Sequence, residues 1–476
     1  KSNLTNSKSA YHQEDIDEFE DSTPEWAMPP LMRDNQMRSI NEVGYDPTTL
    51  YISPENLSKL TPAMQQYWII KKDNFDKIIL FKMGKFYEVF YEDATLLVQH
   101  LGLNFMGRKQ HAGFPESVLD AKVRILVEKG FKVAVVEQTE TDRDRKSRLK
   151  SSGGNKTKKL TNRDLVAIHT IGTISKSESD SNLSALWSLL SNDKNIAVCI
   201  YNPETGNLKL FNFDIKSKHI ITDFRHLLLT FPPSEILLNT SIFPGMLVTL
   251  LNSLVDKPLL TNHISNINKE SIINKITKIR PSFMDEFDLI LKNLNMDRSN
   301  ELVVNNTICL FAYLDSLILL NKSISSLNMN LLINESLLLK MDSQAIYHLQ
   351  LIPCLEENST QSLLSLLDTC NTPMGKRLLK KWIINPLADH SEIIARQNTL
   401  LYLNEIYAHT DELIKTFSKL KDIEKFTCLL GKYGAVEDKK IVNYDDLTNK
   451  RMKSLFSFLE DMEILNSHLG NLSNVI

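Results

Sequence analysis

The sequence is poor in cysteine and contains no long hydrophobic run. Its five cysteines lie far apart along 476 residues, and none has C-x-x-C spacing. This argues against a zinc site or a disulfide framework, and it predicts reduced thiols in a cytosolic or nuclear protein. No stretch of about 18 apolar residues occurs, so no membrane-spanning helix is predicted. The polar N-terminus has no signal-peptide core and begins without Met, which suggests a fragment of a longer protein.

The sequence also lacks the motifs of common enzyme classes. No G-x-x-x-x-G-K-[ST] loop is present, since residues 375–377 (GKR) have neither the upstream glycine nor the final Ser/Thr. No G-x-S-x-G motif occurs. The strand-turn-strand pattern at 195–211 resembles the start of an RNase-H-like nuclease, whose metal site needs a carboxylate on its first strand. Cys199, Tyr201 and Asn202 occupy the candidate positions. We therefore predict no catalytic, cofactor or metal site in this chain.

Charge is nearly balanced overall but unevenly distributed. The net charge is −3, with an acidic stretch at 14–21 (EDIDEFED). Residues 142–164 hold nine Lys/Arg against three Asp. Such a block is usually a solvated loop, but it can also be an edge that contacts phosphates.

The pattern along the chain predicts a multidomain α/β plus α protein. Residues 1–47 are polar, without a sustained period, and are predicted to be disordered. Residues 48–178 suit a small α/β domain, and 179–300 a second one that opens with a hairpin. Residues 301–476 are Leu-rich with long helical periods.

Individual segments carry more specific predictions. In the first domain, strands are expected at 78–83, 131–136 and 165–174. Helices are expected at 92–101, closed by Gly102, and from a capping box at Ser117 to Gly130. In the last domain, residues 363–387 predict two helices joined by a turn at 371–373, with Leu378, Leu379 and Trp382 on one buried face.

The most unusual stretch is FKMGKFYEVFYEDA at 81–94. A strand that alternates faces would bury one ring and half-expose the other. Alternatively, an exposed ring can enter the minor groove and unstack a base step, at a cost of a few kcal/mol that is smaller at a badly paired step. Glu88 would repel intact duplex but could accept a hydrogen bond from a displaced base. Spacing alone leaves both interpretations open.

These residues resemble the Phe-x-Glu mismatch-reading motif of the MutS DNA mismatch repair family. The segments 101–116, 130–141 and 171–175 are similar to the rest of its mismatch-binding domain, and 361–387 with 393–403 to its helical lever domain. The likeness is greatest to the sixth eukaryotic MutS homologue, the mismatch-reading subunit. It implies a mismatch-binding domain at 48–178, an RNase-H-like connector at 179–300, and an incomplete lever at 301–476 that leads toward a clamp.

The resemblance also implies a binding site. Phe86 would stack on the mispaired base and Glu88 would hydrogen-bond to it. Lys85, Tyr87 and Met106 would line the contact, and Arg108 or Lys109 would reach the DNA backbone.

The partners implied are double-stranded DNA with mismatches or small loops, the second eukaryotic MutS homologue as heterodimer partner, and MutL-type proteins, all in the nucleus. ATP and Mg²⁺ are expected only for a C-terminal ATPase domain outside this sequence. Two alternatives stay open: a truncated scaffold that binds repair partners without reading DNA, and a MutS-type protein specialised for recombination junctions.

Overall fold

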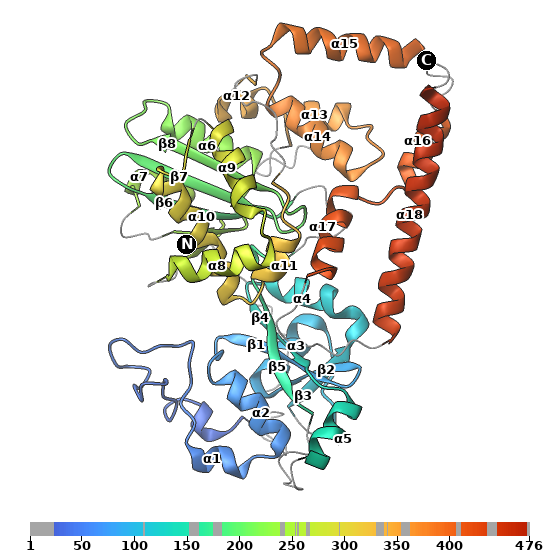
Figure 1. Ribbon diagram of the computed structural model, residues 1–476. Helices are drawn as coiled ribbons and strands as arrows, with labels where there is room; N and C mark the ends of the chain where they lie inside the picture. The colour runs from blue at the N-terminus through green and yellow to red at the C-terminus, as the bar shows by residue number, and fades with distance from the viewer. Residues whose placement is uncertain are drawn as a thin grey trace. The chain divides into compact units, whose positions relative to one another are not determined.

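In the computed structural model, the chain forms two compact units (Figure 1). The first takes in the described residues up to Thr170, and the second those from Ile171 onward. The structure describes residues 23–107, 110–151, 161–174, 183–238, 243–252, 254, 257–262, 267–294, 296–329, 338–339, 341–353, 362–405, 411–435 and 445–473.

The first unit is built on a five-stranded sheet with the strand order β3-β2-β1-β4-β5. Strand β1 pairs antiparallel with β2 and parallel with β4, while β2–β3 and β4–β5 are antiparallel pairs. The strands are β1 (Lys77–Met83), β2 (Phe86–Phe90), β3 (His111–Pro115), β4 (Lys132–Gln138) and β5 (Arg163–His169). The central strands β1 and β4 are nearly continuous apolar runs, as expected for strands that are covered on both faces.

The helices of this unit are η2 (Glu25–Ala27), α1 (Pro54–Lys59), α2 (Pro62–Lys71), α3 (Tyr91–Leu101), η3 (Glu116–Val118), α4 (Leu119–Glu128) and α5 (Asp142–Ser151). Helix α3 ends at Gly102 in the left-handed conformation, as predicted. The predicted capping box at Ser117 is wrong. A 3-10 turn leads into α4, whose N-cap is Val118, without a side-chain cap bond.

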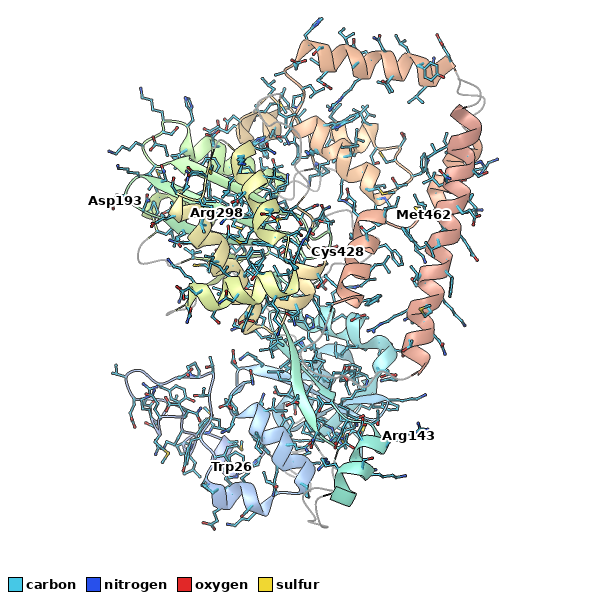
Figure 2. The ribbon with its side chains drawn as sticks, viewed as in Figure 1. Trp26, Arg143, Asp193, Arg298, Cys428 and Met462 are labelled. Atoms are coloured by element: carbon cyan, nitrogen blue, oxygen red, sulfur yellow. The ribbon has the colours of Figure 1, made fainter. Side chains whose placement is uncertain are left out.

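The structure corrects the prediction of disorder for residues 23–47. Asp34 is fully buried and accepts hydrogen bonds from the backbone N–H groups of Gln36, Arg38 and Asp46, and from Arg38 Nε at 2.7 Å. The Trp26 ring packs edge-on against Trp68 of α2, with 4.6 Å between centroids (Figure 2). One buried carboxylate and one ring therefore order a segment that has no helical or strand period. The acidic stretch at 14–21 lies outside the described residues.

The basic block begins as a helix rather than a loop. Arg148 of α5 makes a two-pronged ion pair with Glu140, at 2.7 and 3.0 Å. Burial raises the pKa of Glu140, but hydrogen bonds from Arg148 and the Asn162 N–H outweigh it and hold the pKa below its usual value. Part of the positive charge is thus used inside the fold. Residues 152–160 lie outside the described part.

The second unit contains another five-stranded sheet, ordered β10-β9-β6-β7-β8. Strands β6, β7 and β8 are antiparallel neighbours, while β9 and β10 run parallel to β6. The strands are β6 (Leu186–Ser191), β7 (Asn195–Tyr201), β8 (Leu208–Asp214), β9 (Glu235–Leu237) and β10 (Leu259–Thr261). Trp187 faces a core with Phe224, whereas the next residue, Ser188, bonds to Asn306 of α10. Helices therefore cover both faces of the sheet (Figure 1).

The remaining described elements of this unit are helices. They are α6 (Ile220–Thr230), α7 (Gly245–Asn252), α8 (Lys269–Ile279), α9 (Phe283–Asn293), α10 (Glu301–Ser316), α11 (Leu320–Ser325), α12 (Ser343–His348), α13 (Leu363–Leu367), α14 (Pro373–Ile384), α15 (His390–Glu405), α16 (Asp411–Lys419), α17 (Ile423–Tyr433) and the long α18 (Asp445–Ser473) (Figure 1). No helix among the residues described is long and apolar enough to cross a membrane.

The predicted pair of helices at 363–387 is present as α13 and α14, and Thr372 caps α14. The predicted buried face is wrong. Leu378 is 45% exposed and Trp382 is 39% exposed, with the Arg396 guanidinium 4.0 Å from the centre of the Trp382 ring. The helical period was visible in the sequence, but the surface that the apolar side chains face was not.

Candidate nucleic-acid interface

The site begins at the tight turn between β1 and β2, which we call the open turn (Gly84 and Lys85). Met83 pairs with Phe86, so the turn has two residues. Gly84 has a φ of +63°, which only glycine adopts without strain. Among the residues that the structure describes, none would lie within 4 Å of a Cβ at Gly84, so no described residue packs over the glycine.

Phe86 is the first residue of β2 and is 44% exposed. Strand alternation places Glu88 on the same face and Tyr87 on the opposite one. Tyr87 is only 1% exposed, so the prediction that it lines a DNA contact is corrected. As strand alternation requires, the Tyr87 ring packs inside the sheet and the Phe86 ring remains accessible.

Side chains on the buried face of the β1–β2 hairpin anchor it to the rest of the sheet. The Tyr87 hydroxyl bonds to Glu137 of β4, and Lys82 lies over the Tyr87 ring, 4.3 Å from its centre, while pairing with Glu116. Burial, followed by the Glu137 charge, raises the pKa of Tyr87 well above its ordinary value, so the hydroxyl remains a donor. Phe86 therefore extends from a strand whose opposite face is anchored to the sheet.

Glu88 lies in a more polar setting on the accessible face. Its Oε2 is 3.0 Å from His111 Nε2, and both side chains are about one-fifth exposed. Gly113 of β3 is its cross-strand partner. A Cβ at Gly113 would lie 2.9 Å from Met106 Cε, so the Met106 side chain reaches over this glycine beside Glu88. Met106 is itself 39% exposed.

The structure thus brings Phe86, Glu88 and Met106 to one surface of the β2–β3 pair. Lys85 is exposed in the open turn next to Phe86. Arg108 and Lys109 lie outside the described residues. On α5, Arg143 (Figure 2) and Lys146 are exposed.

Two residues of this surface were missed from the sequence, His111 and Gly113. Their signal is the alternation in HAGFP, which places them two apart on one face of an expected strand. The register that sets Gly113 opposite Glu88 was not readable from either strand alone.

Comparison with known proteins identifies the family. The model of MutS domain I matches residues 61–178, and that of MutS domain III matches residues 344–473. The chain therefore belongs to the MutS family. The Phe86–Glu88 surface falls inside the domain I match.

Individual relatives show which members of the MutS family this chain resembles. The DNA mismatch repair protein Msh6 of Gallus gallus and that of Homo sapiens are each 27% identical to this chain, over 95% of it and 38% of their own length. The DNA mismatch repair protein MutS of Caldanaerobacter subterraneus subsp. tengcongensis is 29% identical, over 87% of this chain and 44% of its own length. The chain is thus homologous to Msh6 and spans under two-fifths of the length of the Msh6 relatives.

Proposed function

We propose that this chain reads mispaired bases in double-stranded DNA, with Phe86 as the probing ring and Glu88 as the hydrogen-bonding reader. The observation that carries the proposal is the half-exposed Phe86 ring beside an open turn, on the same face as a carboxylate. An apolar ring at the end of an anchored strand can enter the minor groove and unstack a base step. Met106 and Lys85 would border the contact; Tyr87, which is buried, would support it from behind.

Glu88 would make the site prefer mispaired DNA to matched duplex. Against intact duplex, a carboxylate near the phosphates is repelled and gains no hydrogen bond. A mispaired base that is displaced into the groove offers a donor, and its step costs less to open. The site therefore gains more from a defect than from a normal pair.

The wider arrangement that we propose follows the family. Residues 48–178 would be the mismatch-binding domain, 179–300 an RNase-H-like connector, and 301–476 a lever that leads to a clamp. The second sheet supports the connector assignment, because three antiparallel strands are followed by two strands parallel to the first. The chain would act in the nucleus with the second eukaryotic MutS homologue and MutL-type proteins. ATP and Mg²⁺ would bind an ATPase domain outside this sequence, and measurable ATP turnover by this chain alone would contradict that.

The test is the binding of the full chain to a matched duplex and to the same duplex with one G·T pair, at fixed low salt, because low ionic strength strengthens phosphate contacts. Phe86→Ala should reduce the preference for the mismatch about tenfold, since one base–aromatic stack contributes roughly 1–3 kcal/mol. Ile125→Ala is the matched control, because Ile125 is an exposed apolar residue that belongs to α4 and not to the hairpin. It should leave the preference unchanged.

Two results would oppose the proposal. If the wild-type chain binds both duplexes alike, or binds neither, the truncated scaffold that contacts only protein partners gains support. If it prefers a four-way junction to both duplexes, a recombination role takes precedence.

A further inference from the structure

We propose that His111 is a positioning residue for mismatch reading: it fixes the Glu88 carboxylate so that one oxygen faces the displaced base. This inference rests on the proposed function above and adds a specificity-determining residue to it. His111 is the first residue of β3 and contacts Glu88 across the strand pair.

The His111 ring is held on one side by an aromatic cluster. It stacks on Phe90, its cross-strand partner, with 4.8 Å between centroids and 18° between planes. Phe90 packs edge-on against the buried rings of Tyr67 and Phe81, at 5.3 and 6.2 Å. The imidazole is therefore oriented by the core, although its own side chain is still 21% exposed.

The backbone fixes His111 as well. The Met106 N–H donates to the His111 carbonyl at 2.7 Å, and the Tyr91 N–H donates to the neighbouring Gln110 carbonyl at 2.8 Å. These two hydrogen bonds hold the backbone at residues 110 and 111, one to Met106 and the other to Tyr91 of α3. The loop that presents Met106 and the strand that presents His111 are thus tied together.

The chemistry of the pair assigns the direction of the bond. An ionised carboxylate has only acceptor sites, so His111 Nε2 must carry the hydrogen that lies between them. Oε2 is then engaged at 3.0 Å, while Oε1 remains to accept from a base N–H. A carboxylate that is oriented before DNA binds does not lose its rotational freedom during binding, which strengthens the contact to the displaced base.

The pair could instead serve only to join β2 to β3. A structural role would affect folding and the binding of both duplexes equally. A positioning role would affect only the difference between mismatched and matched duplex, and only while Glu88 is present. The two roles therefore predict different outcomes.

Two variants test the aromatic ring of His111 and its N–H donor one at a time. His111→Phe keeps a ring for Phe90 but removes the N–H, whereas His111→Gln keeps an N–H donor at about the same reach but removes the ring. Binding to matched and G·T duplexes is measured on the full chain at low salt, together with melting temperature. We expect the Phe variant to lose about tenfold in mismatch preference, as for a hydrogen bond to a charged group, and the Gln variant to retain most of it.

A double substitution completes the test. Glu88→Ala should lower the preference, and adding His111→Phe to it should lower it no further, because His111 acts through Glu88. If His111→Phe alone keeps the full preference, or lowers it equally with and without Glu88, the positioning role is overturned. The proposed function fails separately, when the wild type shows no preference or Phe86→Ala does not reduce it.

Discussion

Two hairpin turns in the described part of the chain each use a left-handed glycine and yet have opposite surroundings. The open turn in the first unit has Gly84 at a φ of +63°, with space around its Cβ position. The turn between β7 and β8 in the second unit, which we call the closed turn (residues 202–206), has Gly206 at a φ of +72°. A Cβ at Gly206 would lie 2.0 Å from the Ser326 carbonyl oxygen.

Hydrogen bonds and an ion pair within the second unit hold the closed turn in place. Asn202 Oδ1 accepts from the N–H groups of Glu204 and Thr205. Helix α17 covers the turn: Lys425 pairs with the buried Glu204 at 2.8 Å, and Cys428 (Figure 2) contacts the Pro203 carbonyl at 3.6 Å.

The comparison shows that a glycine turn gains its role from what surrounds it. The closed turn joins a sheet to helices and leaves no room for a ligand. The open turn ends in exposed Lys85 and Phe86, which is the arrangement expected of a surface that meets a partner. Exposure of a large ring is informative here because the neighbouring ring, Tyr87, is buried.

Placing alanine in the two turns should affect the stability of the closed turn far more than that of the open turn. Gly206→Ala adds left-handed strain and a backbone clash, so we expect a loss of at least about 3 kcal/mol in unfolding free energy. Gly84→Ala adds only the strain and should cost about 1 kcal/mol. Urea unfolding of both variants checks this. Equal losses would show that the turns are not as different as their packing indicates.

A second pair of variants compares rings on one face of the first sheet. Phe81 lies directly opposite Glu88 and is fully buried, so Phe81→Ala should cost about 3–5 kcal/mol. Phe86→Ala should cost about 1 kcal/mol, because nearly half of that ring is already in water. Thermal melting distinguishes the two. A large loss for Phe86→Ala would mean that the ring serves the core rather than a ligand.

Much of the strand and helix order was predictable from periodicity. The buried runs of β1 and β4, the glycine that ends α3, and the hairpin of β7 and β8 all follow local rules. Local sequence could not show that Asp34 orders residues 23–47, since its partner Asp46 lies well beyond a single turn along the chain and meets it only in the fold. Nor could it show that Leu378 and Trp382 remain exposed, because burial depends on which surface a helix meets.

For the candidate site, too, only a part could be predicted from local sequence. The motif around Phe86 indicated an aromatic and a carboxylate with a shared function, but alternation alone left open which ring was accessible. Cross-strand register, which sets Glu88 opposite Gly113 and Phe90 opposite His111, requires the folded sheet. His111 therefore emerged as the neighbour of Glu88 only from the structure.

The smallest expected effect concerns acid stability at the helix that covers the closed turn. Asp422 caps the start of α17 and accepts a two-pronged ion pair from Arg377 of α14, at 2.6 and 2.9 Å. Burial raises the pKa of Asp422, but the Arg377 hydrogen bonds and charge outweigh it and hold the pKa below its usual value. A carboxyl whose pKa is lower in the folded state stabilises the fold above its unfolded pKa, near 4. That stabilisation is lost as the pH falls through the folded pKa.

The melting temperature of the second unit should therefore decline as the pH is lowered below about 4. Asp422→Asn removes the titrating group, so its melting temperature should be lower at neutral pH and should change less with acid. Asp193→Asn is the matched control, because Asp193 is an exposed acid in the loop between β6 and β7 (Figure 2). It should follow the wild-type profile. If Asp422→Asn also follows that profile, the Arg377 pair does not hold α17 against the closed turn, and the rest of the turn's own contacts must account for its closure.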